Sequence, residues 1–187
     1  MRKVILLLML SIFVSATSFA QTQAKDEVSE SKCKAREFLN GRSYFLVKEF
    51  FDLQKIGGVE CQVLIMNKIV SGEKIGCLRL ETQYKLYSDN IIRYTGFIDY
   101  DELDACIQSL EYIKNTLLPS APKVSMKADY TTKDGVYFGV RYNNRKWTPF
   151  VYTSFDKKSE CVLDVENIDS LIAVMHQAKS MIAEKTK

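Results

Sequence analysis

The chain has 187 residues, of which 47% are hydrophobic and 26% are charged, with only 8 glycines and 3 prolines. These proportions exclude a disordered, collagen-like or low-complexity protein and are typical of an ordinary globular domain. The 26 basic and 23 acidic side chains nearly balance, which argues against a protein that binds nucleic acid or acidic membranes through bulk electrostatics.

Residues 1–20 have the pattern of a cleaved secretory signal peptide. Arg2 and Lys3 give a positive start, an apolar run of eleven residues follows over Val4–Val14, and Ser18 and Ala20 occupy the two positions that a signal peptidase reads. The run is shorter than the roughly 20 residues that a membrane-spanning helix needs, and no later stretch is apolar enough to form one. We therefore expect an exported protein, periplasmic or extracellular, with no transmembrane segment. So short a leader is typical of bacteria.

The mature chain would keep all five cysteines, Cys33, Cys61, Cys77, Cys106 and Cys161. Export permits disulfides, but an odd count leaves at least one thiol free or paired between chains. No two cysteines have Cys-x-x-Cys spacing, which disfavours thioredoxin-like redox chemistry and zinc-ribbon sites. Their pairing stays open at this point.

Residues 21–42 are predicted to be a polar N-terminal segment with a short helix over 26–39. Residues 43–118 are predicted to form a strand-rich unit that ends in a helix. Its first segment, 43–51, fits a strand because it is rich in aromatic and β-branched residues, and it fits a helix because its charges fall on helical spacing.

Two stretches, 59–65 and 78–86, alternate apolar and polar residues as strands do. A hairpin register that sets Cys61 opposite Tyr84 brings their apolar faces together. The same register places Cys61 on the buried face and Cys77 on the other face, which argues against a bridge between these two cysteines.

A further strand over 91–98 leads into a helix that Asp99 opens as N-cap, with Glu102 as its capping-box partner. This helix carries an apolar stripe typical of a buried face, made of Leu103, Cys106, Ile107, Leu110, Ile113 and Leu117. Residues 119–122, Pro-Ser-Ala-Pro, end the helix and form a linker.

Residues 123–187 are predicted to be a second strand-rich unit ending in a helix. Alternation and turn residues give strands over 123–130, 136–142, 147–155 and 161–163, and Asp164 caps the last helix. The two helix starts align at an offset of 65 residues, with Asp99, Asp104, Ile107 and Lys114 falling on Asp164, Asp169, Ile172 and Lys179.

We interpret this match as a degenerate duplication. The predicted fold is α+β, with two tandem antiparallel β-meander-plus-helix units packed into one compact domain. Each unit alone would leave its apolar sheet face half covered, so the units should pack together.

Few residues offer catalytic or metal-binding chemistry. The chain has one histidine, His176, so it cannot build a multi-histidine zinc site, and any catalytic triad would have to use this residue. The acidic group Asp99, Asp101, Glu102 and Asp104 resembles a calcium site, but it lacks EF-hand spacing and is explained by capping and the helix dipole. No catalytic residue, metal site or cofactor is predicted.

The candidate ligand contacts lie in the second unit. Residues 119–163 carry eight basic and four acidic residues. An outward face of this region presents Lys123, Lys127, Tyr137 and Arg141, where a polyanion could bind and Tyr137 could stack on it. Two strand-rich units, each followed by a helix, also resemble in outline the single-strand nucleic-acid binders of the PUR and Whirly type. The signal peptide argues against nucleic acid. Trp147, at a strand start, is either a contact residue or a lid on the core.

These observations favour a small exported bacterial protein without catalysis, which binds an unknown ligand or an envelope protein. Its oligomeric state is left open. The alternative is an exported hydrolase that uses a carboxylate pair, which requires a pocket with two acids within about 10 Å. The third hypothesis is a polyanion or nucleic-acid binding module.

Overall fold

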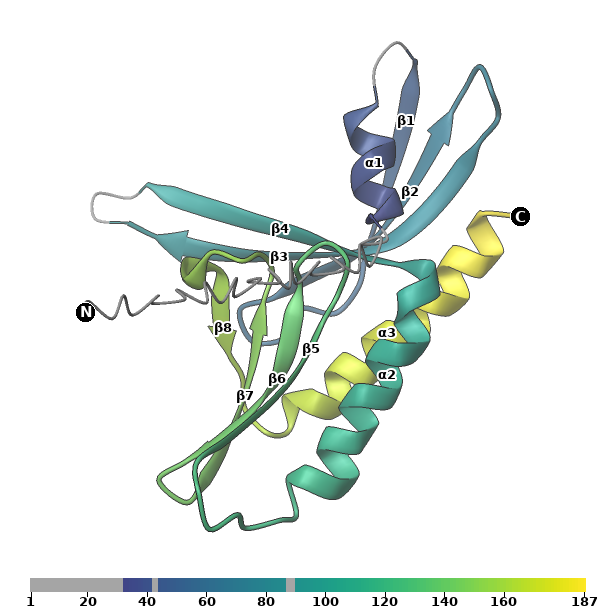
Figure 1. Cartoon of the computed structure of the whole chain (residues 1–187). Helices are drawn as coiled ribbons and strands as arrows, with labels where there is room; N and C mark the ends of the chain where they lie inside the picture. The colour runs from purple at the N-terminus through teal and green to yellow at the C-terminus, as the bar shows by residue number, and fades with distance from the viewer. Residues whose placement is uncertain (1–31, 42–43, 87–89) are drawn as a thin grey trace, which may run out of the picture.

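The computed structural model describes residues 32–41, 44–86 and 90–187. The predicted signal peptide lies outside these ranges, as does the first part of the predicted helix over 26–39. Two four-stranded antiparallel sheets make up most of the molecule, one with strand order β1-β2-β3-β4 and the other β5-β6-β7-β8 (Figure 1). The fold is therefore α+β with two meander-plus-helix units, as predicted.

The first unit begins with the short helix α1 (Lys34–Asn40). It continues with β1 (Leu46–Asp52), β2 (Glu60–Lys68), β3 (Lys74–Lys85), β4 (Ile91–Asp99), a 3-10 turn (Tyr100–Glu102), α2 (Leu103–Tyr112) and a π-helical turn (Ile113–Leu117). The segment that fitted either a strand or a helix is the strand β1.

The second unit comprises β5 (Met126–Thr131), β6 (Tyr137–Asn143), β7 (Lys146–Tyr152), a 3-10 turn (Lys157–Ser159), β8 (Glu160–Val162) and α3 (Asn167–Lys185).

The predicted register of the β2–β3 hairpin was wrong by four residues. Cys61 lies opposite Leu80 instead of Tyr84, because the hairpin closes earlier: the Lys68 amide donates to the Glu73 carbonyl at 2.9 Å. A shift by an even number keeps every side chain on its face. Cys61 is accordingly in the main core and Cys77 on the opposite face, and all five cysteines are free thiols.

The helix of the second unit covers the sheet of the first. α3 packs on β2 and β3, and Gly76 of β3 makes this possible, since a Cβ there would lie 2.7 Å from Cγ2 of Ile182. Figure 1 shows α2 running beside α3 in the opposite direction. The two units therefore share one main core. No helix in the described ranges has both the length and the apolarity to cross a bilayer.

A second, smaller core lies on the other face of the first sheet. There α1 covers the strands with Ala35 and Phe38, which contact the cluster Leu64, Met66, Cys77 and Phe97. The first sheet is thus buried on both faces near α1, which explains why β2 has four consecutive buried residues over 63–66 instead of strict alternation.

The units also meet directly at Gly96 of β4. A Cβ at Gly96 would lie 2.3 Å from Cγ2 of Val136 and 2.4 Å from the carbonyl oxygen of Thr153. Beside this contact the buried hydroxyls of Thr82 and Thr153 bond to each other at 2.7 Å, and Thr82 donates to the Ser159 carbonyl at 3.0 Å. Hydroxyls from both units and the Ser159 carbonyl thus form a buried, hydrogen-bonded junction.

Candidate functional site

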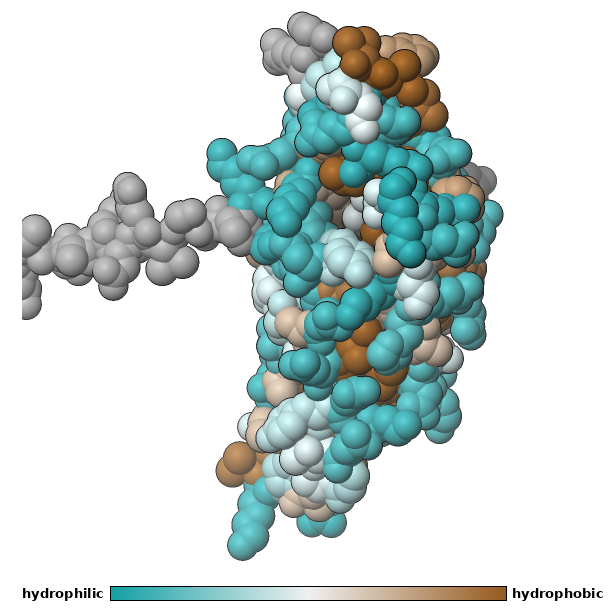
Figure 2. Space-filling view, turned by 90° about the vertical axis from the view of Figure 1, so that its right-hand side faces the viewer, coloured by the Kyte–Doolittle hydropathy of each residue, from teal (hydrophilic) through white to brown (hydrophobic). Residues whose placement is uncertain are grey.

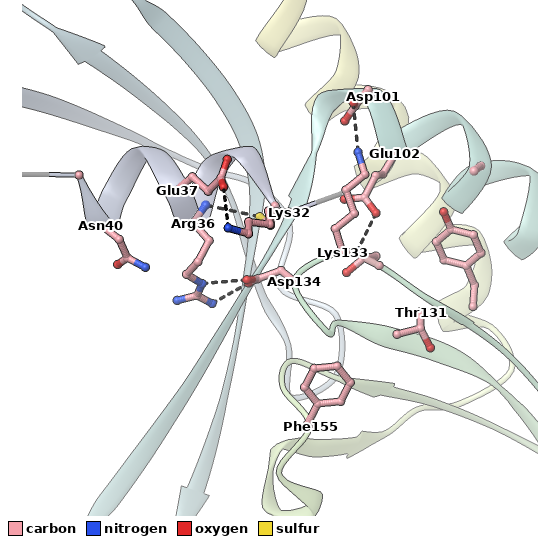
Figure 3. Close-up of a pocket in the computed structure, with 15 residues that line it drawn as sticks. Lys32, Arg36, Glu37, Asn40, Asp101, Glu102, Thr131, Lys133, Asp134 and Phe155 are labelled. Carbon is pink, nitrogen blue, oxygen red and sulfur yellow. Dashed lines mark hydrogen bonds and ion pairs between the residues drawn. The ribbon is translucent and has the colours of Figure 1, made fainter. Parts of the chain in front are cut away.

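A hollow of about 1180 Å³ opens where three distant parts of the chain meet. Its walls are α1, the start of α2, and the turn from β5 to β6, with Phe155 at its rim (Figure 3). We call it the α1–β6 hollow. Three other hollows of the molecule are smaller, at about 240, 370 and 510 Å³.

An arginine clamp forms one wall of the hollow. Arg36 of α1 binds Asp134 of the β5–β6 turn through two parallel bonds, Nε–Oδ1 at 2.8 Å and Nη2–Oδ2 at 2.6 Å (Figure 3). Asp134 is buried and also accepts the Phe97 amide at 2.9 Å. The hydrogen bond to Asp134 raises the pKa of Arg36, so the guanidinium stays charged. This fork-to-fork geometry fixes α1 against the second unit.

Asp99 fixes the start of α1. Its carboxylate accepts the backbone amides of Lys34 at 2.6 Å and of Ala35 at 3.0 Å. It therefore satisfies two of the donors that a helix N-terminus leaves without partners, in a helix too short to be stable by itself. The predicted capping box with Glu102 is also present. Burial raises the pKa of the adjacent Cys33 thiol to about 12, so this thiol stays protonated.

Two adjacent carboxyls at the start of α2 have opposite environments. Glu102 is 5% exposed, and its carboxylate accepts the Lys133 amide at 2.9 Å and the Asp99 amide at 3.4 Å. Burial outweighs these bonds and raises the pKa of Glu102. Burial acts on Asp101 too, but hydrogen bonds from the ammonium groups of Lys34 at 2.6 Å and Lys133 at 3.2 Å outweigh it and lower the pKa of Asp101.

Thr132 contributes the one buried hydroxyl of the wall that has no partner. Its residue is 5% exposed, and its Oγ1 accepts and donates no hydrogen bond within the described part of the chain. The Thr132 backbone is fully used, since the amide donates to Val136 and the carbonyl accepts from Gly135. A buried polar atom without a partner costs about 1–3 kcal/mol. The oxygen itself is covered by protein, so a ligand would recover that cost once the Thr132 side chain turns toward the hollow.

The side chains at the rim of the hollow are exposed and have fewer hydrogen-bond partners than those of its walls. The ring of Phe155 is 76% exposed and lies against Gly135, whose φ of +81° suits a residue without a side chain. Asn40 and Thr131 are exposed on the rim and make no side-chain hydrogen bond within the residues described. The rim therefore offers one flat apolar surface beside two neutral polar groups.

The structure brings three of the five predicted contact residues together. Lys127, Tyr137 and Arg141 lie on the outer face of the second sheet, away from the hollow, where both cations are already neutralised. Lys127 pairs with Asp129 at 3.0 Å and Arg141 with Glu160 at 2.6 Å.

Aromatic rings complete this outer face. Tyr137 stacks on Tyr152 with centroids 4.2 Å apart, and Phe150 lies beneath Lys127 and Arg141. Burial, followed by a hydrogen bond to Glu160, raises the pKa of Tyr152 to about 12.

The other two predicted contacts lie elsewhere. Trp147 is 7% exposed and belongs to the main core, and its indole N–H donates to the Ser120 carbonyl at 2.9 Å. It is therefore the lid on the core, the second of the two alternatives. Lys123 is exposed in the loop before β5.

His176, the one histidine of the chain, is exposed on α3. Among the residues described, no three His, Cys, Asp or Glu side chains gather where they could hold a metal ion.

Sequence reasoning found Asp101 and Glu102 of the hollow but explained them by capping and the helix dipole. It missed Arg36, Asp134 and Thr132, because each is an ordinary residue of a helix or turn until the chain folds. No known protein family, curated protein or solved structure matches this chain.

Proposed function

We propose that this chain is an exported, non-catalytic binding protein that holds an uncharged, hydroxyl-rich ligand of the saccharide class in the α1–β6 hollow. The observation that carries the proposal is the buried Thr132 hydroxyl, which has no partner in a wall whose charged groups are otherwise paired. A cavity with a few converging polar groups is the usual form of a small-molecule site.

The charges of the hollow select against an ionic ligand. Asp134 is bound by Arg36, and Asp101 by two lysines. An incoming anion or cation would have to break one of these pairs. A sugar forms no ion pair. Its hydroxyls can bond to the exposed Asn40 and, once the Thr132 side chain turns toward the hollow, to Thr132, while a C–H face rests on the exposed ring of Phe155.

Mass spectrometry of protein exported under its own leader tests this proposal. A denatured mass that starts at Gln21 supports export, and extra mass retained only under native conditions reports the ligand. Thr132→Val should lose the retained mass, whereas Thr148→Val, on the outer face of the second sheet, should keep it. Without ligand, Thr132→Val should be as stable as the parent or up to about 1 kcal/mol more stable, because a methyl group needs no partner.

A retained mass that survives Thr132→Val would contradict this site. A bare protein would contradict it too if mono- and disaccharides added at millimolar concentration shift neither the native mass nor the melting temperature.

A second candidate is hydrolysis by a carboxylate pair. It is favoured by one observation, the opposite pKa shifts of Glu102 and Asp101, because glycosidases pair a protonated acid with an ionised carboxylate. Turnover of nitrophenyl glycosides that Glu102→Gln abolishes would support it. Turnover unaffected by that change would rule out Glu102 as the acid.

A further inference from the structure

An apolar tip lies at the far end of the first sheet. It consists of Phe45, Ile69 and Val70, which are 68%, 50% and 89% exposed. The Ile69 amide donates to the Phe45 carbonyl at 3.1 Å, so the β2–β3 turn and the residue before β1 form one surface. Figure 1 shows this turn projecting beyond the helices, and Figure 2 shows a brown patch at the same end of the molecule.

We infer that the apolar tip inserts into the interfacial region of a lipid bilayer. This inference goes beyond the proposed function and takes from it only the cellular setting, since an exported protein meets the membranes of the envelope. Large apolar side chains exposed together mark an interaction site more often than single exposed ones do.

The size of the tip favours lipid over a protein partner. A stable protein interface buries roughly 800 Å² on each side and involves about 20–30 residues per partner, and three side chains fall well short of that. A bilayer requires no matching surface. Each methylene group that enters it strengthens binding about fourfold, so three large side chains are enough for reversible attachment.

The backbone of the turn is suited to a medium with little water. Polar backbone groups are costly in lipid unless they are bonded internally. The amides of Lys68, Ile69 and Gly72 donate to carbonyls of Glu73, Phe45 and Lys68, at 2.9, 3.1 and 2.8 Å. The turn can therefore enter the boundary between headgroups and acyl chains without leaving these donors unpaired.

The charges behind the tip limit how deep it can go. Lys48 and Lys74 lie on the strands next to the turn, and neither has an ion-pair partner among the described residues. Ammonium groups at this level would lie among lipid phosphates. Lys68 is already paired with Glu73 at 2.6 Å and its ammonium lies over the ring of Phe38, so we do not expect it to bind lipid phosphates.

Flotation with vesicles tests the inference. The exported, processed protein would be mixed with vesicles of phosphatidylcholine, alone or with one third phosphatidylglycerol, and the floating fraction measured. Val70→Glu should lower the partition coefficient at least tenfold. Val124→Glu is a matched control, because Val124 is 72% exposed in the loop before β5, and it should float like the parent. Both valines are in exposed turns or loops, so both variants should fold, which circular dichroism would verify.

A tryptophan placed at the tip gives an independent readout. In Val70→Trp, vesicles should shift the emission to shorter wavelength, whereas Trp147 of the parent, already buried, should show no shift. Stronger binding to vesicles with phosphatidylglycerol would reflect Lys48 and Lys74, and equal binding would mean that the apolar side chains act alone.

Three results would overturn the inference. The parent protein does not float, or Val70→Glu and Val124→Glu float equally, or sedimentation shows a dimer that Val70→Glu dissociates, which would make the tip an interface between copies. The two variants also separate this inference from the proposed function. Val70→Glu should still retain the ligand of the hollow, and Thr132→Val should still float with vesicles.

Discussion

Lys114, in the π-helical turn that follows α2, forms an ion pair with Asp169 near the start of α3, with Nζ 2.6 Å from Oδ1. The sequence offset of 65 relates Lys114 to Lys179 and Asp169 to Asp104, and these two partners also form an ion pair, at 2.5 Å. Such reciprocal contacts are characteristic of a twofold interface. The two helices thus meet as two copies of one chain would, which supports the duplication interpretation with a geometric observation.

These two ion pairs should contribute little to stability. Their side chains are 33–64% exposed, and exposed pairs contribute about 0–1 kcal/mol. A double-mutant cycle with Lys114→Ala and Asp169→Ala, followed by urea unfolding, should give a coupling energy below about 1 kcal/mol. The equivalent cycle at Lys179 and Asp104 should agree with it. A coupling well above 2 kcal/mol at either pair would mean that the pseudosymmetric contacts hold the helices together.

Gly96→Ala should destabilise the protein by about 2–3 kcal/mol, near the upper end for an overpacked core. The new Cβ would meet the Thr153 backbone, which cannot move without opening the junction between the units. Gly76→Ala is the matched comparison. Its Cβ would meet the ends of Ile65 and Ile182, which can rotate, so we expect about 1 kcal/mol. Equal losses in urea unfolding would contradict this account of the junction.

Arg36→Ala should cost about 2 kcal/mol, because it leaves the buried Asp134 carboxylate with only the Phe97 amide. The loss is smaller than for a fully buried pair, since the Arg36 side chain is 42% exposed. Arg36→Lys should recover part of the loss but not the second bond. Arg93→Ala is the control: its partner Glu81 keeps Arg79, so the change should be below about 1 kcal/mol.

The pH dependence of stability should differ in sign between Glu102 and Asp101. The pKa of Glu102 is raised from 4.5, so its contribution is complete below that pH and is lost as the pH rises through the folded value. The stability of the parent relative to Glu102→Gln should therefore fall as the pH rises above about 4.

Asp101 provides the opposite case. Its pKa is lowered from 3.8, so its contribution is present above that pH and is lost as the pH falls through the folded value. Relative to Asp101→Asn, the parent should gain stability with rising pH at the acid end. Urea unfolding between pH 3 and 8 measures both differences, and slopes of the same sign would contradict the assigned environments.

The sequence predicted what depends on local patterns. Alternation and caps gave the strands, the helix starting at Asp99 and the division into two units. The faces of Cys61 and Cys77 were right even though the register was not, because the error was an even number of residues. The hollow depends on contacts such as Arg36 with Asp134, 98 residues apart. No periodicity encodes a contact between a helix and a turn so far along the chain, and an unpartnered hydroxyl such as Thr132 is recognisable only once its surroundings exist.

The packing of α3 on β2 and β3 has a consequence for how the chain acquires its structure. The first sheet is synthesised well before the helix that covers it. Its apolar face therefore stays uncovered until α3 (Asn167–Lys185) has been made. Contacts between residues so distant in sequence form slowly. During that interval the exposed strands are prone to aggregate. A chain cut short before α3 should therefore not yield a folded first unit, so this final helix completes the fold.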